Sequence, residues 1–171
     1  QKRLQTHLCS RSRVSLVTRS QERRKGDGYF TIGIYRNKTA ENLGTLWRSA
    51  YQLGAAGVFT INHKYKKEST DSFHTMGKIP FWDYPDWDAF LSNRPRGSQI
   101  VAIEMGGTPL SDFKHPKQAI YLLGSEDQGL PPKILAQCQH VVSLEAIHRP
   151  SYNVAVAGSL VMYDRVFELG Q

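Results

Sequence analysis

The sequence predicts an α/β fold in which a mostly parallel sheet carries helices on both faces. The clearest observation is the apolar run at residues 119–123, which is too short for a helix, lacks polar alternation and ends at Gly124. Such runs are typical of strands buried on both faces of a parallel sheet. A second run at residues 141–144 repeats the strand-then-turn pattern. Strands that alternate with helical patterns along a chain indicate a parallel α/β sheet.

The globular part is predicted to begin with two strands around one helix. Residues 29–35 and 57–61 are rich in β-branched and aromatic side chains, as strands are. After Asn42, apolar residues recur at three- and four-residue steps, which predicts a helix capped by Asn42 and ended by Gly54. Arg48 lies more than one turn into this helix. Without further motifs, Asn42 and Arg48 are most simply a helix cap and a surface cation.

A long polar segment follows, at residues 62–77, and it contains three lysines, two histidines and a tyrosine. Interleaved Lys and Tyr suit phosphate contact and base stacking, and a solvated loop is an equally open interpretation. Pro80 cannot donate to a strand ladder, so residues 79–82 are expected to form at most a short edge strand. A helix is predicted at residues 87–91.

The C-terminal half contains the remaining elements. Residues 99–103 are predicted to be a strand, and a final helix with one apolar face is predicted at residues 154–167. Asn153 or Ser151 is well placed to cap that helix.

The net charge of +7 is concentrated in a basic N-terminal arm at residues 1–28. The arm holds eight Lys and Arg against Glu22 and Asp27, which gives +6, and the remaining 14 basic and 13 acidic residues give +1. Such an arm is typical of a flexible segment, and RNA contact and an inert lead-in are equally open. One domain, at residues 29–171, is expected to follow it.

The composition favours a cytoplasmic location, with neither a membrane span nor a metal site. No apolar run reaches the roughly 20 residues that span a bilayer, and the start of the chain lacks the apolar centre of a signal peptide. Cys9 and Cys138 have no CxxC or Cys/His ligand spacing, so neither a disulfide framework nor a zinc site is expected. We treat four histidines, which lack partners at ligand spacing, as ordinary polar residues: His74, His115, His140 and His148.

Two common nucleotide-binding motifs are excluded on detail. Residues 124–129 have the glycine spacing of a P-loop, but a Leu-Pro pair stands where Lys and Ser/Thr should follow. No GxGxxG motif follows the first strand, so a Rossmann cofactor is unsupported. Ligands of open α/β sheets lie outside the carboxyl ends of strands, and we expect three ends to converge, after Ile103, Leu123 and Leu144.

Three motifs carry a more specific signal: Asn-Leu-Gly-Thr-Leu-Trp-Arg at 42–48, Gly-Ser-Glu-Asp-Gln-Gly-Leu at 124–130, and Ser-Tyr-Asn-Val-Ala-Val-Ala at 151–157. In this order they resemble the motifs of the SpoU (TrmH-like) family of the SPOUT superfamily of RNA 2'-O-ribose methyltransferases. The resemblance covers roughly residues 29–167. It implies a C-terminal trefoil knot, although chains rarely knot. It also implies methyl transfer from S-adenosyl-L-methionine to a ribose 2'-hydroxyl of tRNA or rRNA, by a homodimer that brings an arginine near the partner's cofactor.

The resemblance implies the site residues as well. The implied catalytic residues are Arg48, Asn42 and Glu126, and the implied cofactor-binding residues are Ile103, Gly107, Leu123, Gly124, Val142, Leu144, Ser151 and Asn153. A guanidinium is effectively always protonated, so we expect Arg48 to bind an RNA phosphate and stabilise developing alkoxide charge, with Glu126 and Asn42 fixing its orientation. We expect Gly124 to allow close backbone approach to the cofactor, and Asn153 to order the knot loop.

The chain departs from the family pattern in its third motif region. Residues 142–144 read Val-Ser-Leu where the family often has Ile-Pro-Met, and Tyr152 replaces the usual Leu. These departures keep a second function class open: an RNA- or cofactor-binding protein with the SPOUT fold and impaired catalysis. The sequence does not decide between tRNA and rRNA.

Overall fold

A single six-stranded sheet runs through the part of the chain described by the computed structural model, which comprises residues 28–63, 78–149 and 151–169. Almost all of the predicted arm at residues 1–28 and of the polar segment at residues 62–77 lies outside these described residues. The strands are β1 (Tyr29–Tyr35), β2 (Gly57–Ile61), β3 (Phe81–Tyr84), β4 (Gln99–Pro109), β5 (Gln118–Leu123) and β6 (His140–Ser143). Their order is β3-β2-β1-β5-β4-β6, and every pairing between them is parallel. The predicted parallel sheet is therefore confirmed, with β3 at an edge.

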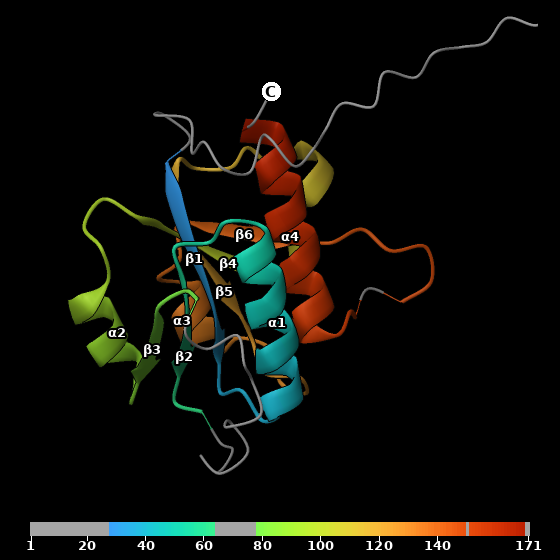
Figure 1. Cartoon of the computed structure of the whole chain (residues 1–171). Coiled ribbons are helices and arrows are strands. Elements are labelled where there is room, and N and C mark those ends of the chain that lie inside the picture. The colour runs from blue at the N-terminus through green and yellow to red at the C-terminus, as the bar shows by residue number, and fades with distance from the viewer. Residues whose placement is uncertain (1–27, 64–77, 150, 170–171) are drawn as a thin grey trace, which may run out of the picture.

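Helices cover both faces of the sheet, as predicted. They are α1 (Ala40–Gln52), α2 (Trp87–Asn93), α3 (Pro132–Leu135) and α4 (Val154–Leu169), with a 3-10 turn at Leu110–Asp112. Figure 1 shows α1 and α4 packed on one side of the sheet, with α2 on the other. Buried side chains of α1 and α4 share one core cluster with alternate residues of the strands, and those of α2 and α3 belong to a second cluster.

The C-terminal helix packs closely because Gly158 carries no side chain. A Cβ at Gly158 would lie 2.9 Å from Leu123 Cδ1 and 3.1 Å from Ile32 Cδ1, and closer still to Leu46 of α1. Real Cβ atoms keep larger separations, so a side chain here would push α4 off the sheet. This packing fixes the start of α4 beside the carboxyl ends of the strands.

The helix starts differ in one respect from the prediction. Helix α1 begins earlier than expected, with Thr39 as its extended N-cap residue, so Asn42 lies in the first turn and is not the cap. The cap of α4 is Asn153, whose Oδ1 accepts from the amides of Ala155 at 3.0 Å and Val156 at 3.3 Å. Of the two candidates for this cap, the structure therefore selects Asn153 over Ser151.

Strand β4 is longer than predicted. Its ladder with β6 pairs Ile103 with Val142 and then Thr108 with the same Val142 before continuing to Pro109. Residues 104–107 are therefore displaced from the ladder between these two pairings, and such bulges often lie beside functional sites. The displaced residues lie at the carboxyl end of the regular part of β4.

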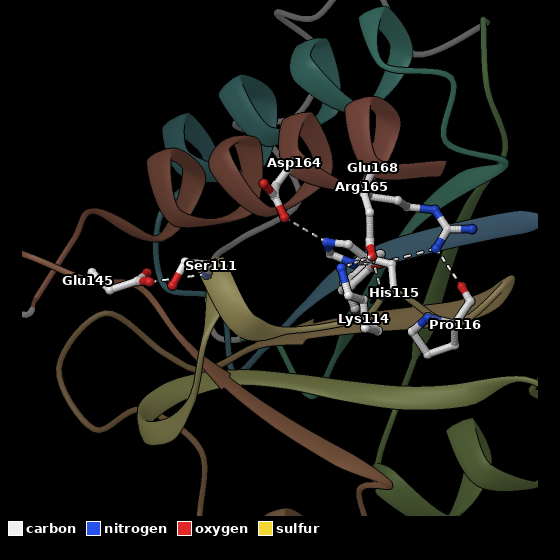
Figure 2. A network of polar contacts seen from close by, with 9 residues as sticks. Ser111, Lys114, His115, Pro116, Glu145, Asp164, Arg165 and Glu168 are labelled. Atoms are coloured by element: carbon white, nitrogen blue, oxygen red, sulfur yellow. Dashed lines mark hydrogen bonds and ion pairs between the residues drawn. The ribbon is translucent and has the colours of Figure 1, made fainter. Parts of the chain in front are cut away.

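A buried polar cluster attaches α4 to the opposite end of the sheet (Figure 2). Arg165 is only 2% exposed, and it donates to the carbonyl oxygens of Pro116 at 2.6 Å and Lys117 at 2.8 Å. The ring nitrogens of His115 lie 2.5 Å from the Tyr121 hydroxyl and 3.0 Å from a carboxylate oxygen of Asp164. The sequence analysis treated His115 as an ordinary polar residue, so this role was missed.

This cluster predicts a pH dependence of stability. Burial lowers the pKa of His115 below its ordinary 6.5, although Asp164 and Glu168 oppose that shift and Arg165 adds to it. Between the lowered folded-state pKa and 6.5, the unfolded chain binds a proton at His115 that the folded chain does not. The free energy of unfolding therefore has its full value above pH 6.5, as far as His115 is concerned, and decreases as the pH falls toward the folded-state pKa. Urea denaturation between about pH 8 and pH 5 should show this decrease.

The His115→Gln variant should lose that part of the pH dependence, because glutamine has no charge to gain. His148→Gln, at an exposed loop position, is the matched control and should keep the wild-type profile. Equal profiles for all three proteins would contradict the assignment to His115.

Candidate functional site

A cavity of about 400 Å³ opens at the carboxyl edge of the sheet, where β5, β4 and β6 end side by side. Its lining comes from the ends of these three strands, the segments that follow them, and the start of α4. The lining residues are Ile103, Glu104, Met105, Gly106, Leu123, Gly124, Ser125, Glu126, Asp127, Gln128, Gly129, Ser143, Leu144, Ser151, Tyr152, Val154 and Ala157. The predicted convergence of the three strand ends is confirmed, and the volume is within the range of about 300–1,000 Å³ usual for cofactor sites.

The segment after β5 forms a tight loop that makes one wall of the cavity. Ser125 and Gly129 exchange backbone hydrogen bonds, of 3.3 Å and 3.0 Å, so residues 126–128 form the tip. A Cβ on Gly124 would lie 2.6 Å from the Leu130 amide nitrogen and closer still to the Gly129 carbonyl carbon. Gly124 is thus required by the loop's own backbone, whereas we had expected it to make room for the ligand.

Three of the displaced residues of β4, at 104–106, form the neighbouring wall. One carboxylate oxygen of Glu104 accepts from the Leu130 amide at 2.8 Å, and the other accepts from the Met105 amide at 3.0 Å. Gly106 has a backbone φ of +81°, which residues with a side chain rarely adopt. No atom lies within 4 Å of the position that a Cβ would take there. The backbone of Gly106 is therefore open to a ligand in the cavity.

Three predicted site residues form one hydrogen-bonded chain. Asn153 Nδ2 donates to Asn42 Oδ1 at 2.9 Å, and Asn42 Nδ2 donates to Glu126 Oε1 at 2.9 Å. Because Asn153 Oδ1 is committed to capping α4, its amide nitrogen must face Asn42, and that contact in turn directs the Asn42 nitrogen toward Glu126. Thr39 Oγ1 donates to the same Glu126 oxygen at 3.2 Å. The fold thereby gives Glu126 a fixed orientation at the cavity.

The cavity is acidic. Its described lining residues include the carboxylates of Glu104, Glu126 and Asp127, and they include no lysine or arginine. Asp127 is paired with Lys38, with 2.5 Å between Lys38 Nζ and Asp127 Oδ2, and this hydrogen bond lowers the pKa of Asp127 below its ordinary value. Such a lining favours a cationic ligand and disfavours a phosphate-rich nucleotide.

Arg48 lies apart from this cavity in the single chain. It is exposed on α1, and among the contacts between described residues none joins it to Asn42 or Glu126. Since α1 advances about 100° per residue, side chains six positions apart point about 120° away from each other. The expectation that Asn42 and Glu126 orient Arg48 is therefore not met within one chain.

Two predicted cofactor residues also lie elsewhere. Gly107 and Val142 are not among the lining residues, and a Cβ on Gly107 would lie 2.8 Å from the Val142 amide nitrogen. They form the close contact between β4 and β6, with Val142 fully buried. Asn153 does not line the cavity either, but its side chain is hydrogen-bonded to Asn42. The remaining predicted cofactor residues do line it: Ile103, Leu123, Gly124, Leu144 and Ser151.

Glu104, Gly106 and Ser125 also line the cavity and were not predicted, because their positions depend on tertiary structure. The strand-ending Glu-Met-Gly-Gly run at residues 104–107 was a usable signal, because paired glycines in a strand often mark a bulge. In the described part of the chain, no group of three or more His, Cys, Asp or Glu side chains is placed to hold a metal ion. No described helix combines the length and apolar character needed to cross a membrane.

Fold and site together define a parallel α/β protein with a cofactor-sized acidic cavity at the carboxyl edge of its sheet. The chain belongs to the SpoU rRNA Methylase family, whose model matches residues 29–163. The resemblance of the three motifs is thereby confirmed at the level of the family.

Two curated relatives illustrate the sequence similarity. The chain is 29% identical over 139 residues to the 23S rRNA (uridine(2479)-2'-O)-methyltransferase of Streptomyces viridochromogenes, covering 73% of this chain and 48% of that protein. It is 27% identical over 128 residues to an uncharacterized tRNA/rRNA methyltransferase of Mycobacterium bovis, covering 71% of this chain and 40% of that protein. The chain thus spans less than half the length of these relatives.

Solved structures support the fold. The SpoU methyltransferase AviRb from Streptomyces viridochromogenes, in complex with AdoMet, has a TM-score of 0.71 at 24% identity, over 82% of this chain and 57% of that one. A structure described for the 2-OH methylation of C/U34 on tRNA has a TM-score of 0.76 at 20% identity, over 91% of this chain and 98% of that one. At these identities the likeness establishes the fold alone.

Proposed function

We propose that this protein is an S-adenosyl-L-methionine-dependent methyltransferase that acts on a ribose 2'-hydroxyl of tRNA or rRNA. The observation that carries the proposal is the acidic cavity at the carboxyl edge, whose wall residue Glu126 is held by Asn42 and Asn153, in a member of the SpoU family. The names of the relatives, which are rRNA and tRNA/rRNA methyltransferases, support the same activity.

The residues around the cavity fit this cofactor. S-adenosyl-L-methionine supplies a methyl group on a positively charged sulfonium, and the carboxylates of Glu104, Glu126 and Asp127 give the cavity the complementary sign. Apolar walls such as Leu123 and Leu144 suit its adenosine part. Gly106 is exposed at the cavity, with no atom within 4 Å of the position a Cβ would take, so its backbone can approach the cofactor closely.

The protein's share of the reaction is placement of the ribose hydroxyl and stabilisation of the charge that develops on its oxygen. Glu126, fixed by Asn42 and Thr39, is an acceptor at the cavity for the hydroxyl proton or for a cationic partner. Arg48 is the second part of the proposal. Its exposure on α1 suits a role toward a partner chain, where it would bind an RNA phosphate and stabilise the alkoxide.

A homodimer and the trefoil knot of the C-terminal segment belong to the same proposal. The dimer is supported by an exposed apolar stripe on α4, formed at helical spacing by Val156 (45% exposed), Leu160 (41%), Tyr163 (55%) and Phe167 (41%). Val161, on the same helix, is fully buried in the core and does not belong to this surface. The knot rests on family membership.

We expect Tyr163→Glu to convert the dimer to a monomer, because a carboxylate in the middle of the stripe would be buried without a partner. Sedimentation velocity at micromolar concentration measures the change. The control is Trp82→Glu, which alters an exposed aromatic residue on β3 at the edge of the sheet. A Tyr163→Glu protein that sediments like the wild type would show that α4 is not the interface.

The remaining function class is a binding protein with impaired turnover, raised by the departures in the third motif region. Two of the departing side chains make defined hydrogen bonds: the Tyr152 hydroxyl donates to the Glu145 carbonyl oxygen at 2.8 Å, and Ser143 Oγ donates to the Gly107 carbonyl oxygen at 3.0 Å. These bonds give the altered residues defined places in the cavity wall, which favours an intact cofactor site.

The test combines cofactor titration with transfer of a tritium-labelled methyl group to total tRNA and to rRNA. Transfer that maps to a 2'-O-methyl site supports the enzyme, and the labelled fraction identifies the RNA class. Cofactor binding without transfer to either RNA supports the binding protein. RNA contact by residues 1–28 and a cytoplasmic location also remain proposals, which rest on the basic composition of the arm and on the cysteine pattern.

A further inference from the structure

Two cations follow β1 at the same edge of the sheet as the cavity. Arg36 and Lys38 lie just before α1, and Lys38 reaches across to Asp127 in the cavity wall. Lys38 does not itself line the cavity. It is therefore a cation beside an acidic cavity, in contact with one of its carboxylates.

The Lys38–Asp127 pair is not needed to hold the cavity wall. The loop is already closed by the backbone bonds between Ser125 and Gly129, and its tip is held by Glu126, which accepts from Asn42 and Thr39. Both partners are half exposed, at 45% and 50% of their side chains. Ion pairs this exposed contribute little to stability, because water screens both charges, so another anion can displace the carboxylate easily.

Because the cavity is negatively charged, RNA binding there calls for a cation nearby. An RNA strand that brings a ribose to an acidic cavity also brings phosphates, which the carboxylates repel. Among the described residues, Lys38 is the cation in direct contact with the cavity wall. A phosphate can take the place of Asp127 on the ammonium group, since both are oxygen anions of similar geometry toward a point charge.

The backbone beside Lys38 supports a site at this position. Arg36 has φ +54°, an uncommon conformation for a residue with a side chain, and its amide donates to the Ile61 carbonyl oxygen at 2.8 Å. Its guanidinium lies 5.5 Å from the centre of the Tyr35 ring, and its Nε is buried without a partner among the described residues. Conformations of this kind are unfavourable for residues with side chains and are found disproportionately at functional sites.

We propose that Lys38 binds an RNA phosphate beside the target ribose, and that Asp127 competes with this phosphate, so that the ion pair opens when RNA binds. The inference rests on the proposed function and adds a substrate-positioning residue to Asn42, Arg48 and Glu126.

The test measures binding of fluorescein-labelled poly(U) RNA by anisotropy over a series of salt concentrations. Lys38→Ala should weaken binding about tenfold, the loss of one charge-assisted contact, and should reduce the slope of log K against log salt by about 0.7. Asp127→Asn should strengthen binding about two- to fivefold, because it frees Lys38 from a weak competitor. The two members of one ion pair are thus expected to act in opposite directions.

Matched controls separate this effect from net charge. Lys133→Ala on α3 and Asp88→Asn on α2 make the same charge changes at exposed positions elsewhere. Each should change binding less than its counterpart at the cavity. In the Lys38→Ala background, Asp127→Asn should do no more than Asp88→Asn, because the competition requires the ammonium group.

Three results would overturn the inference. The first is weaker RNA binding in both Lys38→Ala and Asp127→Asn. The second is an Asp127→Asn gain that persists without Lys38. The third is a loss of S-adenosyl-L-methionine affinity in Lys38→Ala, since the pair would then support the cavity wall.

A separate measurement of methyl transfer by the wild type distinguishes this inference from the proposed function. The predicted RNA-binding pattern without methyl transfer would refute the proposed function and leave phosphate binding by Lys38 supported. A wild type that binds no RNA would overturn both.

Discussion

Replacing Gly124 with valine is expected to abolish binding of S-adenosyl-L-methionine. Any Cβ at this position would lie 2.6 Å from the Leu130 amide nitrogen and would overlap the carbonyl carbon of Gly129, and both are backbone atoms that cannot rotate away. The loop between Ser125 and Gly129 must then open, and with it the wall that carries Glu126 and Asp127. Isothermal titration with the cofactor should show no measurable heat of binding.

The control is Gly54→Ala, at the end of α1. Gly54 has a positive φ, +77°, and no atom lies within 4 Å of the position its Cβ would take. This variant should lose about 1–2 kcal/mol of stability from its strained backbone and should retain cofactor affinity. Circular dichroism of Gly124→Val establishes that the sheet and helices remain. Wild-type cofactor affinity in a folded Gly124→Val protein would falsify the assignment of this loop to the site.

The second large effect is expected for Arg48→Ala, which should lower turnover about a hundredfold or more. Under the proposed function, this variant loses one preorganised cation toward the RNA phosphate and the developing alkoxide. Cofactor affinity should stay within a few-fold of the wild type, because Arg48 does not line the cavity. Arg48→Lys should not restore turnover, since an ammonium group cannot reproduce the planar fork of a guanidinium.

Because Arg48 is exposed, it can act on the cavity of its own chain or on that of the partner chain, and mixed dimers distinguish the two. If Arg48 acts on the partner's cavity, a mixed dimer of Arg48→Ala and Gly124→Val contains one site with both a working cavity and an arginine. Random mixing makes half of the dimers mixed, so about a quarter of the wild-type activity should return from two inactive proteins. No recovery in verified mixed dimers would mean that Arg48 does not act across the interface, and near wild-type methylation by Arg48→Ala would make it a surface residue.

The sequence by itself determined the class of fold. Short apolar runs such as residues 119–123 are typical of strands buried between two layers, and the helical patterns between them supply those layers. The strand ends after Ile103 and Leu123 followed from the same runs, because ligands of parallel sheets lie at their carboxyl ends. Asn42, Glu126 and Asn153 were implied by the resemblance of the three motifs to the SpoU family, and the structure joins them in one hydrogen-bonded chain.

Tertiary structure alone decided what each of these positions does. Hydrogen bonds that join Asn42 to residues 84 and 111 positions away depend on the packing of α1 beside α4, which no local pattern contains. The same holds for Gly124 and Gly107. Each lacks a side chain where the backbone of another segment packs against it, residues 129–130 for Gly124 and residues 141–142 for Gly107. His115 was treated as an ordinary polar residue from the sequence, and the fold buries it together with Arg165. Burial depends on how the layers assemble, which no local pattern contains.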